Sequence, residues 1–193
     1  MALCEGFFLL ENSMELKDRL VTGIKKVQVN QLVQEVLSSD TLFAEMVQFA
    51  ISDHRVQGPK AAWVIAHATA IDPRMANLFL KQWRETLDKT LNPSVQREIL
   101  KIISHCSLPE EMEGWFLNKC FMILQSPTTE VAAKYHSISF ILAQTKRFPE
   151  LKLELVSILE EQVTWHTPAW QRYIGKIITR LTKQKPLRGK RNS

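Results

Sequence analysis

The chain has 193 residues and a net charge of +5, and 45% of its side chains are apolar, which fits one ordinary domain with a continuous core. Its six glycines and two tyrosines are few for a β-protein, and no run approaches the ~20 apolar residues of a membrane-spanning helix, so no membrane contact is expected. The three cysteines (Cys4, Cys106 and Cys120) lack CxxC spacing, which argues against a disulfide framework and predicts a cytoplasmic protein.

The N-terminal residues 1–13 have a short apolar patch without a basic segment before it, so we do not expect them to be a signal peptide. We expect residues 1–13 to be a disordered extension, residues 14–182 to form a single helical-repeat domain, and residues 183–193 to be a basic disordered tail. Within the domain, the first predicted helices cover about 15–25, 28–37 and 41–52. Ser39 and Asp40 supply the polar start of the third, before a strong apolar face.

The stretch from Pro59 to Trp83 is the clearest two-helix unit in the chain. Pro59 predicts a helix start, and the run of alanines after it predicts a helix buried on most sides. Asp72 precedes Pro73, so it is pushed out of the helical region and can cap the next helix. In that second helix four apolar residues share one predicted inward stripe: Met75, Leu78, Phe79 and Trp83.

Prolines then mark the remaining helices. Seven of the eight lie where a helix is predicted to start, with gaps of one helix and one short loop: 59, 73, 93, 109, 127, 149 and 168. Asn92, Ser126 and Thr167 precede three of them as predicted N-caps. The spacing of these prolines predicts a repeating unit of about 37 residues that contains two helices.

Each remaining helix has its own predicted inward residues. They are Val95, Ile99, Ile102 and Ile103 for 94–105; Met112, Trp115, Phe116, Phe121 and Leu124 for 110–125; Val131, Tyr135, Ile138 and Leu142 for 128–147; Leu151, Leu155, Ile158 and Leu159 for 150–163; and Trp170, Tyr173, Ile174, Ile177, Ile178 and Leu181 for 168–182.

Three segments carry a resemblance to a known family: KAAWVIAHATAIDP, NPSVQREILKII and EVAAKYHSISFILAQTKRFPELKLELV. They resemble HEAT-type repeats over about residues 28–182. The resemblance implies an all-α, right-handed α-α superhelix of about four helix pairs and a terminal helix. The chain also resembles small bacterial HEAT-like proteins of unknown function, some of which carry the name adenylosuccinate lyase. The serine-rich signature loop of that enzyme family, SSxMPxKxN, does not occur here.

The sequence predicts no catalytic residue, no cofactor site and no metal site. It has no GxGxxG, P-loop, GxSxG or HExxH motif, and no two histidines share i, i+4 spacing. We interpret His67, Cys106 and Cys120 as packing residues. The five tryptophans (63, 83, 115, 165 and 170) are interpreted mainly as core residues, and the alternative is that some line a binding surface.

The favoured function is a non-catalytic scaffold that binds a protein or peptide. In HEAT-type stacks the second helices line the concave side, so the resemblance implies partner contacts at Arg74, Lys81, Arg84, Asn118 and Lys119. The alternative is nucleic-acid binding, in the manner of helical-repeat DNA glycosylases, through the C-terminus. Its last 22 residues hold eight basic and no acidic side chains, whereas residues 1–171 have a net charge of −3. Arg172, Lys176 and Arg180 recur every four residues there, and a simple solvated helix face remains open as a third interpretation.

Overall fold

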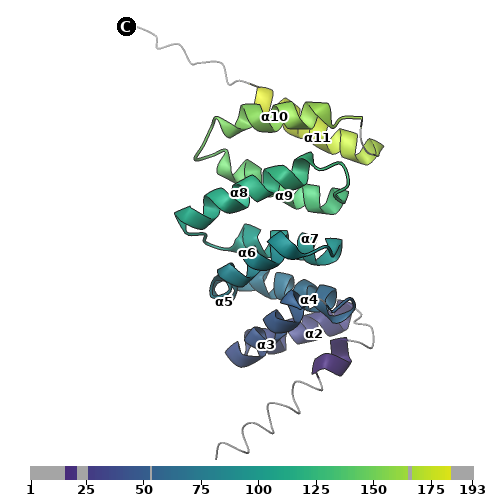
Figure 1. Ribbon diagram of the computed structural model, residues 1–193, viewed down its shortest axis with the longest axis vertical. Coiled ribbons are helices and arrows are strands. Elements are labelled where there is room, and N and C mark those ends of the chain that lie inside the picture. Colours follow the sequence, from purple (N-terminus) through teal and green to yellow (C-terminus); the bar gives the residue numbers. More distant parts are fainter. Residues whose placement is uncertain (1–15, 21–25, 53, 165–166, 184–193) are drawn as a thin grey trace, which may run out of the picture. The chain divides into compact units, whose positions relative to one another are not determined.

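The structure is a computed structural model that describes residues 16–20, 26–52, 54–164 and 167–183. Every regular element in these residues is a helix, which confirms the all-α fold class (Figure 1). After a helical segment over 16–20, the elements are α2 (Lys26–Leu37), α3 (Asp40–Ile51), α4 (Gln57–Ile71), α5 (Pro73–Asn77), α6 (Leu80–Lys89), α7 (Pro93–His105), α8 (Glu110–Gln125), α9 (Val131–Gln144), α10 (Leu151–Glu161) and α11 (Pro168–Thr182).

The described residues divide into two compact units, one up to Phe116 and one from Leu117. In chain order the helices are pairs: α2 with α3, α4 with α5 and α6, α7 with α8, and α9 with α10, followed by α11. The predicted extension over 1–13 and the tail beyond Lys183 lie outside the described residues, and the single domain over 14–182 stays a prediction. In the part of the chain that the structure describes, no helix is both long and apolar enough to cross a membrane.

In the N-terminal unit, α4 is the central helix and contacts α2, α3 and α7. It is buried on most sides, as its alanine-rich sequence predicts, and Ala61, Ala62 and Ala66 are fully buried. Gly58 allows a close approach at its first turn, because an added Cβ would lie 3.0 Å from the backbone oxygen of Ser52. Small side chains therefore allow α4 to pack against three helices at once.

Four predicted helix starts are capped by the side chains expected from the sequence. Ser39 accepts a hydrogen bond from the N–H of Leu42 at 3.2 Å, and Asp72 accepts one from that of Arg74 at 3.0 Å. Asn92 and Thr167 cap α7 and α11 in the same way. Each such cap stabilises its helix by about 1 kcal/mol.

Three proline positions differ from the prediction, and one of them, Pro149, lies two residues before α10, whose N-cap is Glu150. Helix α4 begins at Gln57, so Pro59 is its third residue rather than its first. Pro127 does not start a helix, because α9 begins only at Val131 with Glu130 at its N-cap. The Ser126 N–H instead bonds the Met122 carbonyl in the last turn of α8, and Pro127 ends that helix because it has no N–H to continue the ladder. Ser126 is therefore not an N-cap.

The predicted inward stripe of the helix after Pro73 is wrong at one position. The helix is interrupted at Leu78 and Phe79, which separate α5 from α6. The interruption changes the helical phase, so Leu78 is 78% exposed while Trp83 is fully buried. Met75 and Phe79 are half-buried.

In the C-terminal unit the predicted inward face of α9 is also wrong in part. Val131 and Tyr135 are exposed, and only Ile138 of the four predicted residues is fully buried. The buried side instead includes Ala133, Lys134, Ser137, Ile138, Phe140, Ile141 and Gln144. Apolar periodicity could not find this side because polar residues share it.

The buried Lys134 belongs to a polar network that joins three helices of this unit. Its Nζ donates to Oε1 of Gln162, just after α10, at 3.2 Å. Nε2 of Gln162 donates in turn to the carbonyl of Leu124 in α8 at 2.7 Å. Burial lowers the pKa of Lys134. The network thus satisfies polar groups that would otherwise destabilise the core.

Candidate binding surfaces

Trp83 fixes the orientation of α6, which carries six of the polar residues considered below. The interruption at Leu78–Phe79 would leave backbone groups of α5 without helical partners. The Trp83 indole N–H donates to the carbonyl oxygen of Ala76 at 3.2 Å, and both residues are fully buried. The polar side of α6 consequently faces away from this core.

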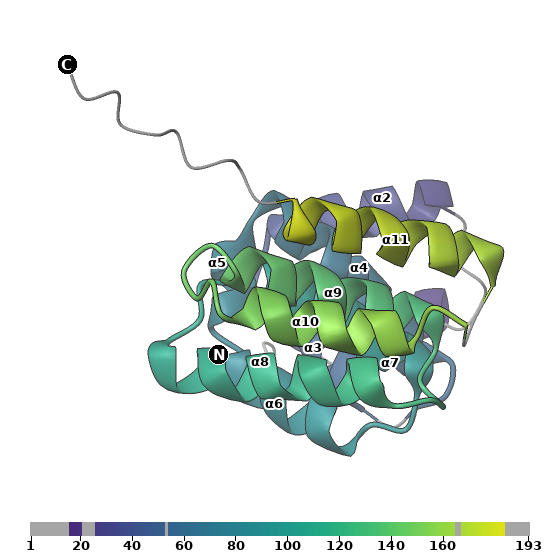
Figure 2. The same cartoon turned by 90° about the horizontal axis from the view of Figure 1, so that it is seen from above.

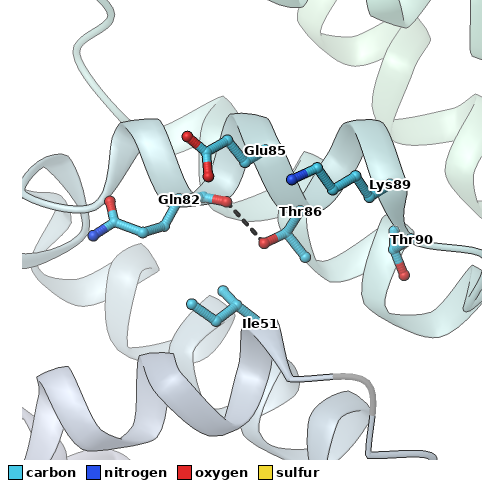
Figure 3. A pocket seen from close by; sticks show the side chains of 6 residues that line it. All are labelled: Ile51, Gln82, Glu85, Thr86, Lys89 and Thr90. Carbon is cyan, nitrogen blue, oxygen red and sulfur yellow. Dashed lines mark hydrogen bonds between the residues drawn. The ribbon is translucent and has the colours of Figure 1, made fainter.

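A small hollow lies between α3 and α6, the second helices of two consecutive pairs (Figure 3). Ile51 reaches from the end of α3 toward α6, whose lining residues recur at helical spacing: Gln82, Glu85, Thr86, Lys89 and Thr90, the last just after the helix. The hollow has a volume of about 250 Å³. Pockets for small molecules are usually larger, roughly 300–1,000 Å³, and more apolar. The size and lining suit a single side chain of a larger partner.

Arg74, predicted as a contact residue, is engaged close to its own position. Its Nε and Nη2 donate to the Asp72 carboxylate at 2.9 and 2.7 Å. The side-chain hydrogen bond from Arg74 is the largest cause that lowers the pKa of Asp72 to about 2. Arg74 therefore reinforces the corner between α4 and α5, and it does not line the hollow.

Lys81 and Arg84 lie on the exposed side of α6. The Arg84 guanidinium carbon is 4.9 Å from the centre of the Trp115 ring in α8, a cation–π distance. Neither residue lines the hollow, although both come from the helix that forms most of it. Gln82, Glu85 and Lys89 were not predicted as contact residues, although their spacing places them on one side of α6.

Asn118 and Lys119 lie in the part of α8 that belongs to the C-terminal unit. Asn118 is exposed and its amide contacts the Met122 sulfur at 3.9 Å, whereas Lys119 is half-buried. Adjacent residues on a helix do not share a face. The structure therefore does not join these two residues into one surface.

The predicted basic residues of α11 do come together. Trp170, Ile174 and Ile177 bury one side of the helix, and the opposite side is an open surface. It is lined by Arg172, Gly175, Lys176, Thr179, Arg180 and Lys183. An added Cβ at Gly175 would meet nothing within 4 Å, so the cations surround open space. Thr179 and Lys183 continue the same helical spacing but were not predicted.

The remaining chemically notable residues are used in packing. His67 lies 5.7 Å from the Trp63 ring, and its pKa is lowered by burial first and then by the charge of Lys101. Burial raises the pKa of Cys106 and of Cys120 to about 12, far from the range of a reactive thiol. Trp83 and Trp170 are buried, Trp63 and Trp115 are half-buried, and Trp165 lies outside the described residues. No group of three or more potential metal ligands gathers among the described residues.

Comparison with known proteins identifies a family. A family model described as a HEAT repeat domain matches residues 16–181, which include all the helices described above except the last residue of α11. No curated protein and no solved structure matches the chain.

Proposed function

The chain belongs to the HEAT repeat domain family, and on that basis we propose that it is a scaffold whose second helices α3 and α6 bind a peptide segment of a protein partner. The observation that carries the proposal is the hollow between these helices. One short side chain of the partner would enter the hollow above Ile51. The chain on either side of it would lie along α6.

The residues of α6 offer the groups that such a segment needs. Gln82 supplies a donor and an acceptor, Glu85 supplies acceptors, and Lys89 supplies donors. The Thr86 hydroxyl already donates to the Gln82 carbonyl at 2.8 Å, so it presents mainly its lone pairs. This mixture of donors and acceptors matches the polar groups of a peptide better than it matches a ligand whose charges all have the same sign.

Arg84 favours binding on the same helix because it is already positioned. Its contact with Trp115 restricts the side chain before any partner arrives. Ordering a free arginine costs binding free energy, and a pre-ordered one avoids part of that cost. Arginine and tryptophan are also enriched among residues that dominate interface energetics. Lys81, Arg74, Asn118 and Lys119 remain proposed contacts.

Photo-crosslinking in the full chain tests the proposal. A benzophenone amino acid is placed at Gln82, beside the hollow, and as a matched control at Asn30, an exposed position on α2. The captured protein is identified by mass spectrometry and purified. Its affinity is then measured by calorimetry for the wild type, Glu85→Arg and Lys89→Glu, with Lys26→Glu on α2 as the charge control.

We expect the partner to crosslink from position 82 but not from position 30. Each α6 variant should weaken binding by about fivefold or more, equivalent to at least ~1 kcal/mol, while Lys26→Glu binds like the wild type. Equal crosslinking at both positions, or unchanged affinity in both α6 variants, would show that the partner binds elsewhere or that no such partner exists.

A further inference from the structure

The exposed side of α11 is a row of positive charge without a compensating acid. Arg172, Lys176, Arg180 and Lys183 follow one another at three or four residues, or about 5–6 Å along the helix axis. No residue from Thr167 to Lys183 is acidic, and none of these four cations forms an ion pair with any described residue. Such a row matches a polymer that carries one negative charge on each unit.

Aromatic rings border this row within the same unit, where α9, α10 and α11 lie together (Figure 2). Tyr173 of α11 is half-buried, and its ring centre is 4.8 Å from that of Tyr135 in α9. Tyr135 is 47% exposed, so part of its ring is accessible. Tyr173 lies three residues before Lys176 and seven before Arg180, so it is next to both on the surface of the helix. The two rings therefore border the row of cations.

We propose that this surface binds single-stranded nucleic acid. The phosphates would follow Arg172, Lys176 and Arg180, and an unpaired base would stack on Tyr135. Proteins that bind single strands combine a basic track with aromatic rings in this way, because every base has a flat face that can stack. The inference concerns residues other than those of the proposed peptide site and does not depend on that site.

Two other partner classes fit less well. A helix that lies in a membrane surface must offer an apolar face to the lipid, but the apolar side of α11 (Trp170, Ile174 and Ile177) is buried in its own unit. An acidic protein could pair with the cations but would leave no role for the exposed Tyr135. A duplex keeps its bases paired, so its interaction with Tyr135 would also be weak.

The test is fluorescence anisotropy with the full chain and labelled probes. The probes are oligouridylate and oligothymidylate of about 20 nucleotides, a duplex of similar length, and polyglutamate. Affinities are measured from about 50 to 200 mM salt, because phosphate contacts release counterions and weaken as salt rises. We expect both single strands to bind more tightly than the duplex or polyglutamate.

Two variants separate charge from stacking. The triple variant Arg172→Gln, Lys176→Gln, Arg180→Gln should weaken single-strand binding at least tenfold and reduce the slope of log K against log salt by about 2, at about 0.7 for each lost phosphate contact. Tyr135→Leu should weaken it about fivefold or more without changing that slope, and Tyr135→Phe should restore it. The matched control Lys26→Gln, Arg55→Gln, Lys146→Gln removes three exposed cations elsewhere and should bind as the wild type does.

Several results would overturn the proposal. They are no binding of either single strand at low salt, binding by the triple variant equal to that of the control, and tighter binding of polyglutamate than of both strands. Unchanged affinity in Tyr135→Leu together with equal binding of duplex would overturn the assignment to single strands. Loss of binding on removal of residues 184–193, with the triple variant unaffected, would overturn the assignment to α11.

Discussion

Replacing the buried Lys134 with methionine is expected to remove a pH dependence from the stability of the protein. Methionine is similar in length to lysine but carries no charge. Lys134 is fully buried, and burial lowers its pKa in the folded state below its ordinary value of 10.5. The folded state therefore releases this proton at a lower pH than the unfolded state does.

The sign and size follow from proton linkage. Between the folded pKa and about pH 10.5 the unfolded chain holds more protons at this site, so the free energy of unfolding rises with pH. The slope is at most about 1.4 kcal/mol per pH unit for one group. Burial raises the pKa of Cys120 and of Tyr173 to about 12, so their contributions decrease with rising pH above about 9 and 10. The wild type and the Lys134→Met variant both contain Cys120 and Tyr173, so the contributions of these groups cancel in the difference between the two free energies of unfolding.

The assay is urea unfolding followed by circular dichroism from about pH 7 to pH 10.5. The free energy of unfolding of the wild type should increase relative to that of Lys134→Met as the pH rises. Near pH 7 two effects on the stability of the variant oppose each other: it loses a buried charge, but Oε1 of Gln162 loses the donor that Lys134 supplied. The change in the free energy of unfolding with pH is therefore a sharper measurement than its value at pH 7. The exposed Lys146→Met is the control and should follow the wild type. A difference that stays constant over this range would refute a lowered pKa at Lys134.

Three further predictions concern packing and caps. Trp83→Phe should lower the free energy of unfolding by about 2 kcal/mol, because the variant loses the hydrogen bond to Ala76 and part of a buried ring. Trp63→Phe changes a half-buried ring and should lower it by less than about 1 kcal/mol. Equal losses in denaturant unfolding would contradict the role given to Trp83. Asn92→Ala should cost about 1 kcal/mol and Ser126→Ala less than about 0.5, and the reverse order would restore Ser126 as a cap. Cys120 should resist iodoacetamide at about pH 8 until the chain unfolds; rapid alkylation of the folded protein, mapped by mass spectrometry, would contradict its burial.

Local signals predicted much of the fold. A proline after a capping side chain marks a helix start by its own chemistry, so the starts at Pro73, Pro93 and Pro168 needed no knowledge of the rest of the chain. Pro127 failed because proline is equally suited to follow a helix as to begin one. The distinction depends on where the Ser126 N–H bonds, and that is a property of the preceding helix.

The surfaces were harder to predict, because they depend on which side of each helix is buried. On α11 the buried side is apolar throughout, so the opposite row of Arg172, Lys176 and Arg180 could be found from spacing alone. On α9 a lysine is buried and Tyr135 is exposed, so apolar periodicity gave the wrong side. The hollow beside α6 depends on the interruption at Leu78–Phe79, which no proline or glycine in the sequence marks.

The shortness of α5 has a consequence for the order of folding. A helix of five residues cannot persist by itself, because too few hydrogen bonds offset the cost of its first turn. Its Ala76 carbonyl receives the indole N–H only when Trp83 is packed, so α5 should acquire its structure after α6 has docked. Substitutions in α5 should then accelerate unfolding and leave the folding rate nearly unchanged. In kinetic terms, this corner of the repeat closes late and opens early.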